Sequence, residues 1–254
     1  GDKRGKTQES MQRREWDGYV EDFGLTGTEG RLKYPVFEVH GNHDSPGGDG
    51  LAIDGLIARS KARQGVSRSA NGLHYSWDWG GVHCINLGIV VGQDRSIDQR
   101  RRYNPMDSLE FLIGDLQQHA SDLSKPVLIT HHVDVLRYSK ACDGTDAANL
   151  GMEWNPCDVA AYYQAIRKYN VIAIMYGHTH VRNIQNWNGT QQKVDQGIPL
   201  LNIDNSSHFS GGNQAFFYIE IDSKELRVRE VATKDSWQSH FWTPTIWRFP
   251  VQSV

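Results

Sequence analysis

The sequence lacks a long hydrophobic run and a strong excess of charge of either sign. No segment approaches the roughly 18 consecutive apolar residues that a membrane-spanning helix needs, so we expect no membrane span. The 27 basic and 30 acidic residues give a formal net charge of −3. A charge this small gives no electrostatic case for nucleic acid or an anionic membrane as a partner. With 254 residues, the chain can bury a full core as one large domain or two small ones.

Two motifs of other hydrolases are also absent. No His-Glu-Xaa-Xaa-His occurs, which weighs against a zinc peptidase. No Gly-Xaa-Ser-Xaa-Gly occurs, which weighs against a serine hydrolase built on a nucleophile elbow. If the protein is a hydrolase, its chemistry must come from other residues.

Cysteine is scarce, with three in the chain. Cys84 falls in a predicted strand, where we expect a small core residue. Cys142 and Cys157 share one loop region and could pair in an oxidising compartment, although their spacing does not decide it. The localisation of the protein therefore stays open.

Three apolar runs are each followed by polar side chains that could bind a metal. Residues 35–39 precede Gly41-Asn42-His43-Asp44, and residues 127–130 precede His131-His132. Residues 171–176 precede Gly177-His178-Thr179-His180. Taken alone, a histidine after a strand is more often a surface residue, and Gly-Asn-His-Asp is also a good turn sequence. Taken together, the three stretches predict a site beyond the carboxyl ends of neighbouring strands. Nitrogen and oxygen ligands without thiolate suit Mn, Fe or Zn.

The same three motifs, in this order, resemble the calcineurin-like metallophosphoesterases over roughly residues 1 to 220. The resemblance implies a four-layer α/β/β/α sandwich, with two metal ions at its edge and a phosphate ester as substrate. We expect residues 1–235 to form this domain and the aromatic-rich tail 236–254 to pack on it.

The resemblance also implies a set of metal ligands: Asp2, Asn42, His131, His178 and His180. Asp2 would bridge the two ions, and His180 would belong to the second metal site. His131 is preferred to His132 because the first histidine of such a pair matches the family's ligand position. His43 would instead protonate the leaving oxygen of the substrate, with Asp44 orienting and charging its ring.

One part of the family pattern is missing, because no Asp-Xaa-His occurs before Gly41. Gly1-Asp2 resembles the start of the family's second motif, although Gly5 stands where an acidic or amide residue is usual. We therefore expect the first strand and its two ligands to lie upstream of this sequence. Their absence keeps a second reading open, in which the chain is a catalytically impaired or non-catalytic binding scaffold of the same fold.

Hydrophobic periodicity predicts the remaining elements. Helices are expected over 8–23, near 50–60, over 107–119 with a capping-box-like start at Asp107, and from Asp158 onwards. Strands are expected over 35–39, 73–79, 82–87, 127–130, 171–176, 198–203, 215–221 and 226–231, with Gly80-Gly81 as a hairpin turn. His74 and His83 fall in that hairpin and are predicted to be side chains of a sheet face rather than ligands.

The substrate is not fixed by any motif. The choices between monoester and diester, and between small molecule, lipid and nucleotide, would depend on the loops 45–71, 88–106 and 133–157. The run Arg100-Arg101-Arg102 could hold a substrate anion, but such a run is more often solvated. The oligomeric state is likewise open.

Overall fold

The computed structural model describes residues 3–44, 49–92, 102–137, 153–192, 194–204 and 213–251, with the side chains of residues 3–8 left out. The helices are α1 (Lys3–Asp22), α2 (Leu51–Ala62), α3 (Ser108–His119) and α4 (Pro156–Ile166). The strands are β1 (Ser67–Arg68), β2 (Tyr75–Trp79), β3 (Val82–Asn86), β4 (Val127–Thr130), β5 (Val171–Tyr176), β6 (Asn183–Trp187), β7 (Ile198–Asn202), β8 (Gln214–Ile221), β9 (Glu225–Thr233) and β10 (Phe241–Pro250). No described helix is both long and apolar enough to cross a membrane.

The strands form a large mixed sheet and a small antiparallel one. The large sheet has the order β1-β2-β3-β4-β5-β7-β6, and the small sheet has the order β10-β9-β8. Neighbours β3, β4, β5 and β7 are parallel, because α3, α4 and the edge strand β6 with its loops return the chain between them. This arrangement confirms the predicted α/β fold class.

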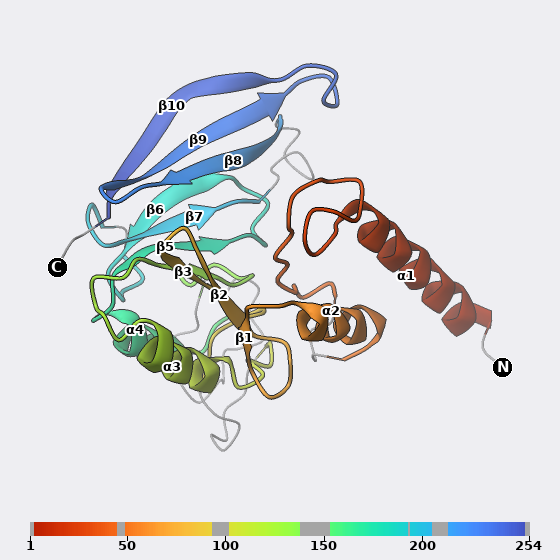
Figure 1. Ribbon diagram of the computed structural model, residues 1–254, viewed down its shortest axis with the longest axis horizontal. Coiled ribbons are helices and arrows are strands. Elements are labelled where there is room, and N and C mark those ends of the chain that lie inside the picture. Colours follow the sequence, from red (N-terminus) through yellow and green to blue (C-terminus); the bar gives the residue numbers. More distant parts are fainter. Residues whose placement is uncertain are drawn as a thin grey trace.

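Helices α3 and α4 cover one face of the large sheet, and the small sheet covers the other (Figure 1). The helix-side core joins Leu112 of α3 and Ile166 of α4 to Ile129 of β4, all fully buried. The core between the sheets joins Val228 of β9 to Ala173 of β5. The β10 strand, in the segment predicted to be a tail, is the outer strand of the small sheet and pairs with β9.

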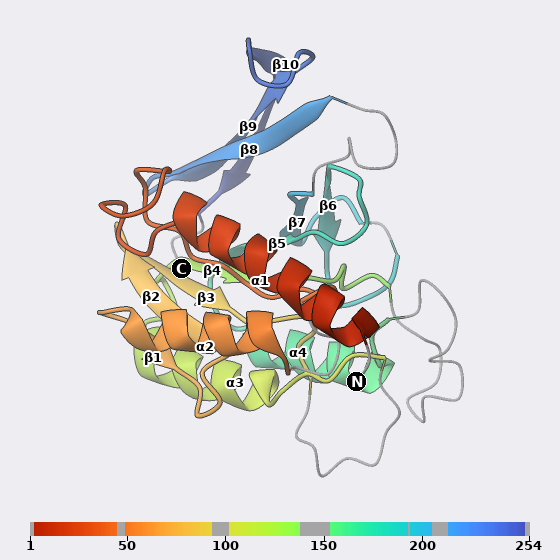
Figure 2. The same cartoon turned by 90° about the vertical axis from the view of Figure 1, so that its right-hand side faces the viewer.

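Helices α1 and α2 lie together beside the two sheets (Figure 2). Their contact is close: a Cβ atom added at Gly55 would lie 2.1 Å from the nearest atom of the Trp16 indole ring. No described helix lies over the outer face of the small sheet, where Phe216, Tyr218 and Trp242 are 43–48% exposed. The layers that the described residues form are therefore helix, large sheet and small sheet.

Two local predictions were wrong. The run 35–39 belongs to no strand, because loop backbone and side chains meet it instead of a neighbouring strand: the Val36 N–H donates to Gly24 O, and the Glu38 carbonyl accepts from Tyr75 Oη and Asn86 Nδ2. Asp107 precedes α3 in a left-handed conformation and makes no side-chain capping bond. By contrast, the hairpin of β2 and β3 turns at Gly80-Gly81, both with positive φ, as predicted.

His83 carries a buried charge within strand β3. Its Nδ1 lies 2.7 Å from Asp78 Oδ1 and its Nε2 lies 2.7 Å from Asp115 Oδ2. Burial alone would lower the pKa of His83, but the bonds to Asp115 and Asp78 outweigh it and raise the pKa. Since both ring nitrogens face carboxylates, the ring is an imidazolium that donates twice.

This network makes stability depend on pH. Because the pKa of His83 is higher in the folded than in the unfolded chain, its stabilisation is complete below the unfolded pKa of about 6.5 and is lost as pH rises through the folded pKa. We expect the free energy of unfolding of the wild type to approach that of His83→Gln as pH rises, by at most about 1.4 kcal/mol per pH unit. Urea unfolding of both proteins between pH 6 and 9 measures this difference. A difference that grows with pH would show that the ring is folded in its neutral form.

Candidate functional site

The carboxyl ends of β4 and β5 bring two of the three polar motifs together. The strands are parallel neighbours with Thr130 opposite Met175, so the residues that follow them leave the sheet side by side. Backbone hydrogen bonds position the segments that follow the two strands: His132 N–H donates to Gly88 O at 2.8 Å, and Gly177 N–H donates to His132 O at 3.0 Å. The Gly-Asn-His-Asp turn reaches the same edge.

Three side-chain atoms from the three motifs converge there. Asn42 Oδ1 lies 2.8 Å from His132 Nε2 and 3.1 Å from His178 Nδ1. The two ring nitrogens lie 3.2 Å from each other. We refer to Asn42, His132 and His178 as the three-residue cluster. Each member is partly buried, so the cluster lies at the surface end of the sheet rather than in the core.

The structure brings His132, and not His131, to Asn42 and His178. His131 is fully buried, and its ring packs edge-on against Trp154 and Tyr162, with centroid distances of 5.1 and 5.7 Å. Burial lowers the pKa of His131 to about 3, so this ring is neutral. Successive side chains of an extended segment point to opposite sides, which sends His131 into the core and His132 towards the edge.

Gly41 is required for the position of His132. A Cβ atom at residue 41 would lie 2.8 Å from Cε1 and 2.9 Å from Nε2 of the His132 ring. Contacts this short do not occur, so only glycine allows the ring to lie against the turn that carries Asn42. The glycine of the motif thus serves a close approach.

The Gly-His-Thr-His turn has a strained backbone. His178 and His180 have φ values of 71° and 57°, in the left-handed region that residues other than glycine seldom adopt. Asp204 helps to hold this turn, because its Oδ2 accepts the backbone N–H of His180 at 2.8 Å. The role of the His180 side chain as a ligand stays a prediction.

Glu153 lies behind His178 and was not predicted from the sequence. Its Oε1 is 2.8 Å from His178 Nε2, the ring nitrogen that faces away from Asn42. Arg137 Nε lies 2.8 Å from Glu153 Oε2, and Arg102 Nη1 lies 3.5 Å from Oε1. Burial by itself would raise the pKa of Glu153, but His178 and the two arginines lower it, so the carboxylate is ionised. Glu153 stands in a loop without a motif, and no signal in the sequence marks it.

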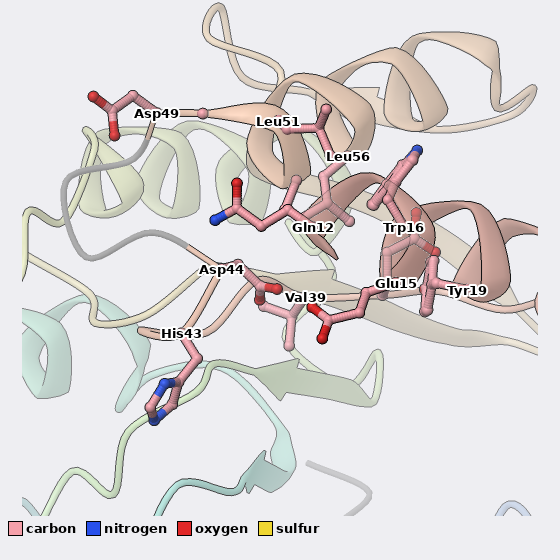
Figure 3. Close-up of a pocket in the computed structure, with 13 residues that line it drawn as sticks. Gln12, Glu15, Trp16, Tyr19, Val39, His43, Asp44, Asp49, Leu51 and Leu56 are labelled. Atoms are coloured by element: carbon pink, nitrogen blue, oxygen red, sulfur yellow. The ribbon is translucent and has the colours of Figure 1, made fainter. Parts of the chain in front are cut away.

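His43 and Asp44 line a pocket of about 550 Å³ between α1, α2 and the turn. Figure 3 shows the Asp44 carboxylate directed towards the side of Glu15 of α1, with the His43 ring on the other side of the chain. Asp44 Oδ2 accepts the Gly41 N–H at 2.7 Å, so this carboxylate stabilises the turn. The orientation of His43 by Asp44 stays a prediction.

Some predicted residues lie outside the described part of the chain. They are Asp2, Arg100, Arg101 and Cys142. Cys157 is disulfide-bonded, and Cys84 is a free, buried thiol. Among the described residues no three His, Cys, Asp or Glu side chains converge as a metal site, because the three-residue cluster consists of two imidazoles and an amide.

The chain matches the family model of the calcineurin-like phosphoesterases, named Metallophos, over residues 5–182. The match spans more than half of the chain and includes all three motifs that form the site. The chain therefore belongs to the calcineurin-like phosphoesterase family, whose members are generally metal-dependent. A search of curated proteins found no match.

Proposed function

We propose that the protein hydrolyses a phosphate ester with a metal-activated water held at the three-residue cluster. Family membership supports phosphoester hydrolysis in general. The observation that carries the proposal is the convergence of Asn42 Oδ1, His132 Nε2 and His178 Nδ1 within 2.8–3.2 Å of one another.

These three atoms fit a metal ion in spacing and chemistry. Ligands at about 2.1 Å from a metal and at right angles to each other lie about 3.0 Å apart, close to the three separations observed. The protonation pattern fits as well: His178 Nε2 faces Glu153, which leaves the lone pair of Nδ1 for a cation. In this proposal His132 takes the ligand role that the family resemblance assigned to His131.

The remaining ligands follow from the family pattern. Asp2 would bridge two ions of Mn, Fe or Zn, and His180 would bind the second of them. When bound, a metal pair lowers the pKa of a water molecule and neutralises charge on the phosphoryl oxygens. The neutral Asn42, His132 and His178 keep the site cationic, which favours an anionic phosphoryl group.

His43 is proposed as the group that protonates the leaving oxygen. It follows Asn42 directly, it is exposed, and it lines the pocket beside α1 and α2. The same pocket would receive the leaving group. Glu15, Asp44 and Asp49 line it, and no lysine or arginine of the described residues does so. We therefore expect esters with a neutral or cationic leaving group to be preferred to those with an anionic one.

One observation favours a second candidate function, a binding scaffold without catalysis. The described residues bring candidate ligands together at the three-residue cluster, and within the described ranges no three His, Cys, Asp or Glu side chains converge. A scaffold would still bind a phosphate ester or a single metal ion but would not turn substrate over.

Hydrolysis assays separate the two candidates. The 254-residue chain is treated with a chelator, reloaded with Mn²⁺ or Zn²⁺, and offered chromogenic phosphomonoesters and phosphodiesters with neutral, cationic and anionic leaving groups. The proposal predicts metal-dependent turnover that Asn42→Ala removes. Metal binding without turnover would support the scaffold, and turnover that survives Asn42→Ala would contradict the site.

The proposal also predicts the result of Gly41→Ala. The added methyl group must displace the His132 ring, because its nearest ring atom would be 2.8 Å away. Misplacement of a catalytic group by about 1 Å can cost about 100-fold in rate, so we expect kcat/KM to fall by about that factor while the urea midpoint changes little. Gly114→Ala is the matched control, since nothing lies within 4 Å of a Cβ there. Equal activity of the two variants would show that the His132 contact with the turn has no role.

A further inference from the structure

Glu153 is held rigidly at the back of His178. The backbone N–H groups of Glu153 and Trp154 both donate to Arg137 O, at 2.6 and 2.9 Å. Asn155 then caps α4 by accepting the N–H of Cys157. Glu153 is 4% exposed and its neighbour Trp154 is 2% exposed. The backbone of Glu153 is therefore anchored independently of the contact between its side chain and His178.

The carboxylate is also committed to its charged form by several neighbours. Tyr103 Oη donates to Oε1 at 3.2 Å. The guanidinium group of Arg137 lies beside Oε2, and that of Arg102 lies beside Oε1. An ionised acceptor facing His178 Nε2 requires that this nitrogen carries the ring proton. The other nitrogen, Nδ1, lies 3.1 Å from Asn42 Oδ1 and 3.2 Å from His132 Nε2, so it is the nitrogen that would face a metal ion at the three-residue cluster.

We propose that Glu153 is a positioning residue that makes His178 a metal ligand: it holds the proton on Nε2, fixes the ring, and strengthens Nδ1 as a donor. The inference rests on the proposed function, because it needs a metal ion at the three-residue cluster. A carboxylate behind a metal-binding histidine sets the tautomer and raises the basicity of the ligand, and its loss typically costs 10- to 100-fold in metal affinity.

The molecule contains a matched control for this contact. Asp115 and His83 form a second buried carboxylate–histidine pair at 2.7 Å, with the Asp115 side chain 1% exposed, as is that of Glu153. This pair joins β3 to α3, and among the described residues it makes no hydrogen bond or ion pair with Asn42 or His178. If burial and charge alone mattered, substitution of either carboxylate would have the same effect on the protein.

The test compares Zn²⁺ affinity of metal-free wild type, Glu153→Gln and Asp115→Asn, measured by competition with a chromophoric chelator. We expect Glu153→Gln, which keeps the shape and loses the charge, to weaken Zn²⁺ binding by about 10- to 100-fold. Asp115→Asn should lower the urea midpoint and leave the affinity within about twofold. Affinity of Glu153→Gln within twofold of the wild type would overturn the inference, as would equal losses in both variants.

A second measurement does not depend on the variants folding. The nitrogen chemical shifts of His178 in the Zn²⁺-loaded wild type report which ring nitrogen keeps a proton and which binds the metal. We expect a protonated Nε2 and a metal-bound Nδ1, and coordination through Nε2 would overturn the inference. A wild type that binds no Zn²⁺ would instead overturn the proposed function itself, so the two failures are distinguishable.

Discussion

Alanine in place of His132 is expected to weaken metal binding by more than about 100-fold and to abolish phosphoester hydrolysis, whereas alanine in place of the adjacent His131 is expected to leave both nearly unchanged. Loss of a direct ligand should exceed the 10- to 100-fold loss typical of a residue behind a ligand. His132 Nε2 is 2.8 Å from Asn42 Oδ1, while His131 packs against Trp154 and Tyr162. Metal content after gel filtration and kcat/KM on a chromogenic phosphoester measure the difference.

His131→Ala has its own expected effect, on stability. Its ring is fully buried, and removal of a large core side chain leaves a cavity that typically costs 2–5 kcal/mol. We therefore expect a lower urea midpoint with metal content per folded chain preserved. The reverse pattern, with metal lost in His131→Ala and kept in His132→Ala, would restore the ligand assignment that the family resemblance implied.

Alanine in place of His43 is expected to lower kcat by about 10²- to 10⁴-fold, the usual contribution of a general acid, with metal content unchanged. The ring follows Asn42 but is exposed, and it lines the leaving-group pocket. Its loss should matter least for substrates whose leaving group is already a good one, because such a group departs without a proton. Rates with leaving groups of different acidity, together with elemental analysis, test both parts of this prediction.

A parallel variant separates the role of His43 from that of the turn. Asp44→Asn keeps an oxygen that can accept the Gly41 N–H, which Asp44 Oδ2 now accepts at 2.7 Å, but removes the negative charge next to His43. Loss of metal in proportion to activity in His43→Ala would mean that the ring is a ligand and not an acid. A normal rate in Asp44→Asn would mean that Asp44 acts on the turn alone.

The central strands were predictable because continuous apolar runs identify them. Strands β4 (Val127–Thr130) and β5 (Val171–Tyr176) have the predicted bounds, and each is buried between helices and the small sheet. The run 35–39 is also largely apolar, although it contains Pro35 and Glu38, and no neighbouring strand pairs with it in the described structure. The residue types show that a segment is apolar, while its pairing into a sheet depends on which segments lie beside it in space.

The candidate site was predictable in its motifs but not in its details. Asn42 and His178 lie together as expected, since both follow segments at one end of the sheet. The choice between His131 and His132 depends on which way the chain faces as it leaves β4, and a shift of one residue reverses it. Glu153 and Asp204 come from segments without a motif, and only the folded chain places them beside His178 and His180.

The most direct test of the proposed function is the position of a metal ion in a crystal of the protein soaked with Zn²⁺ or Mn²⁺, located by anomalous scattering. The account predicts an ion at about 2.0–2.2 Å from Asn42 Oδ1, His132 Nε2 and His178 Nδ1. An ion bound elsewhere, or a three-residue cluster that stays hydrogen-bonded and metal-free at saturating concentration, would contradict it.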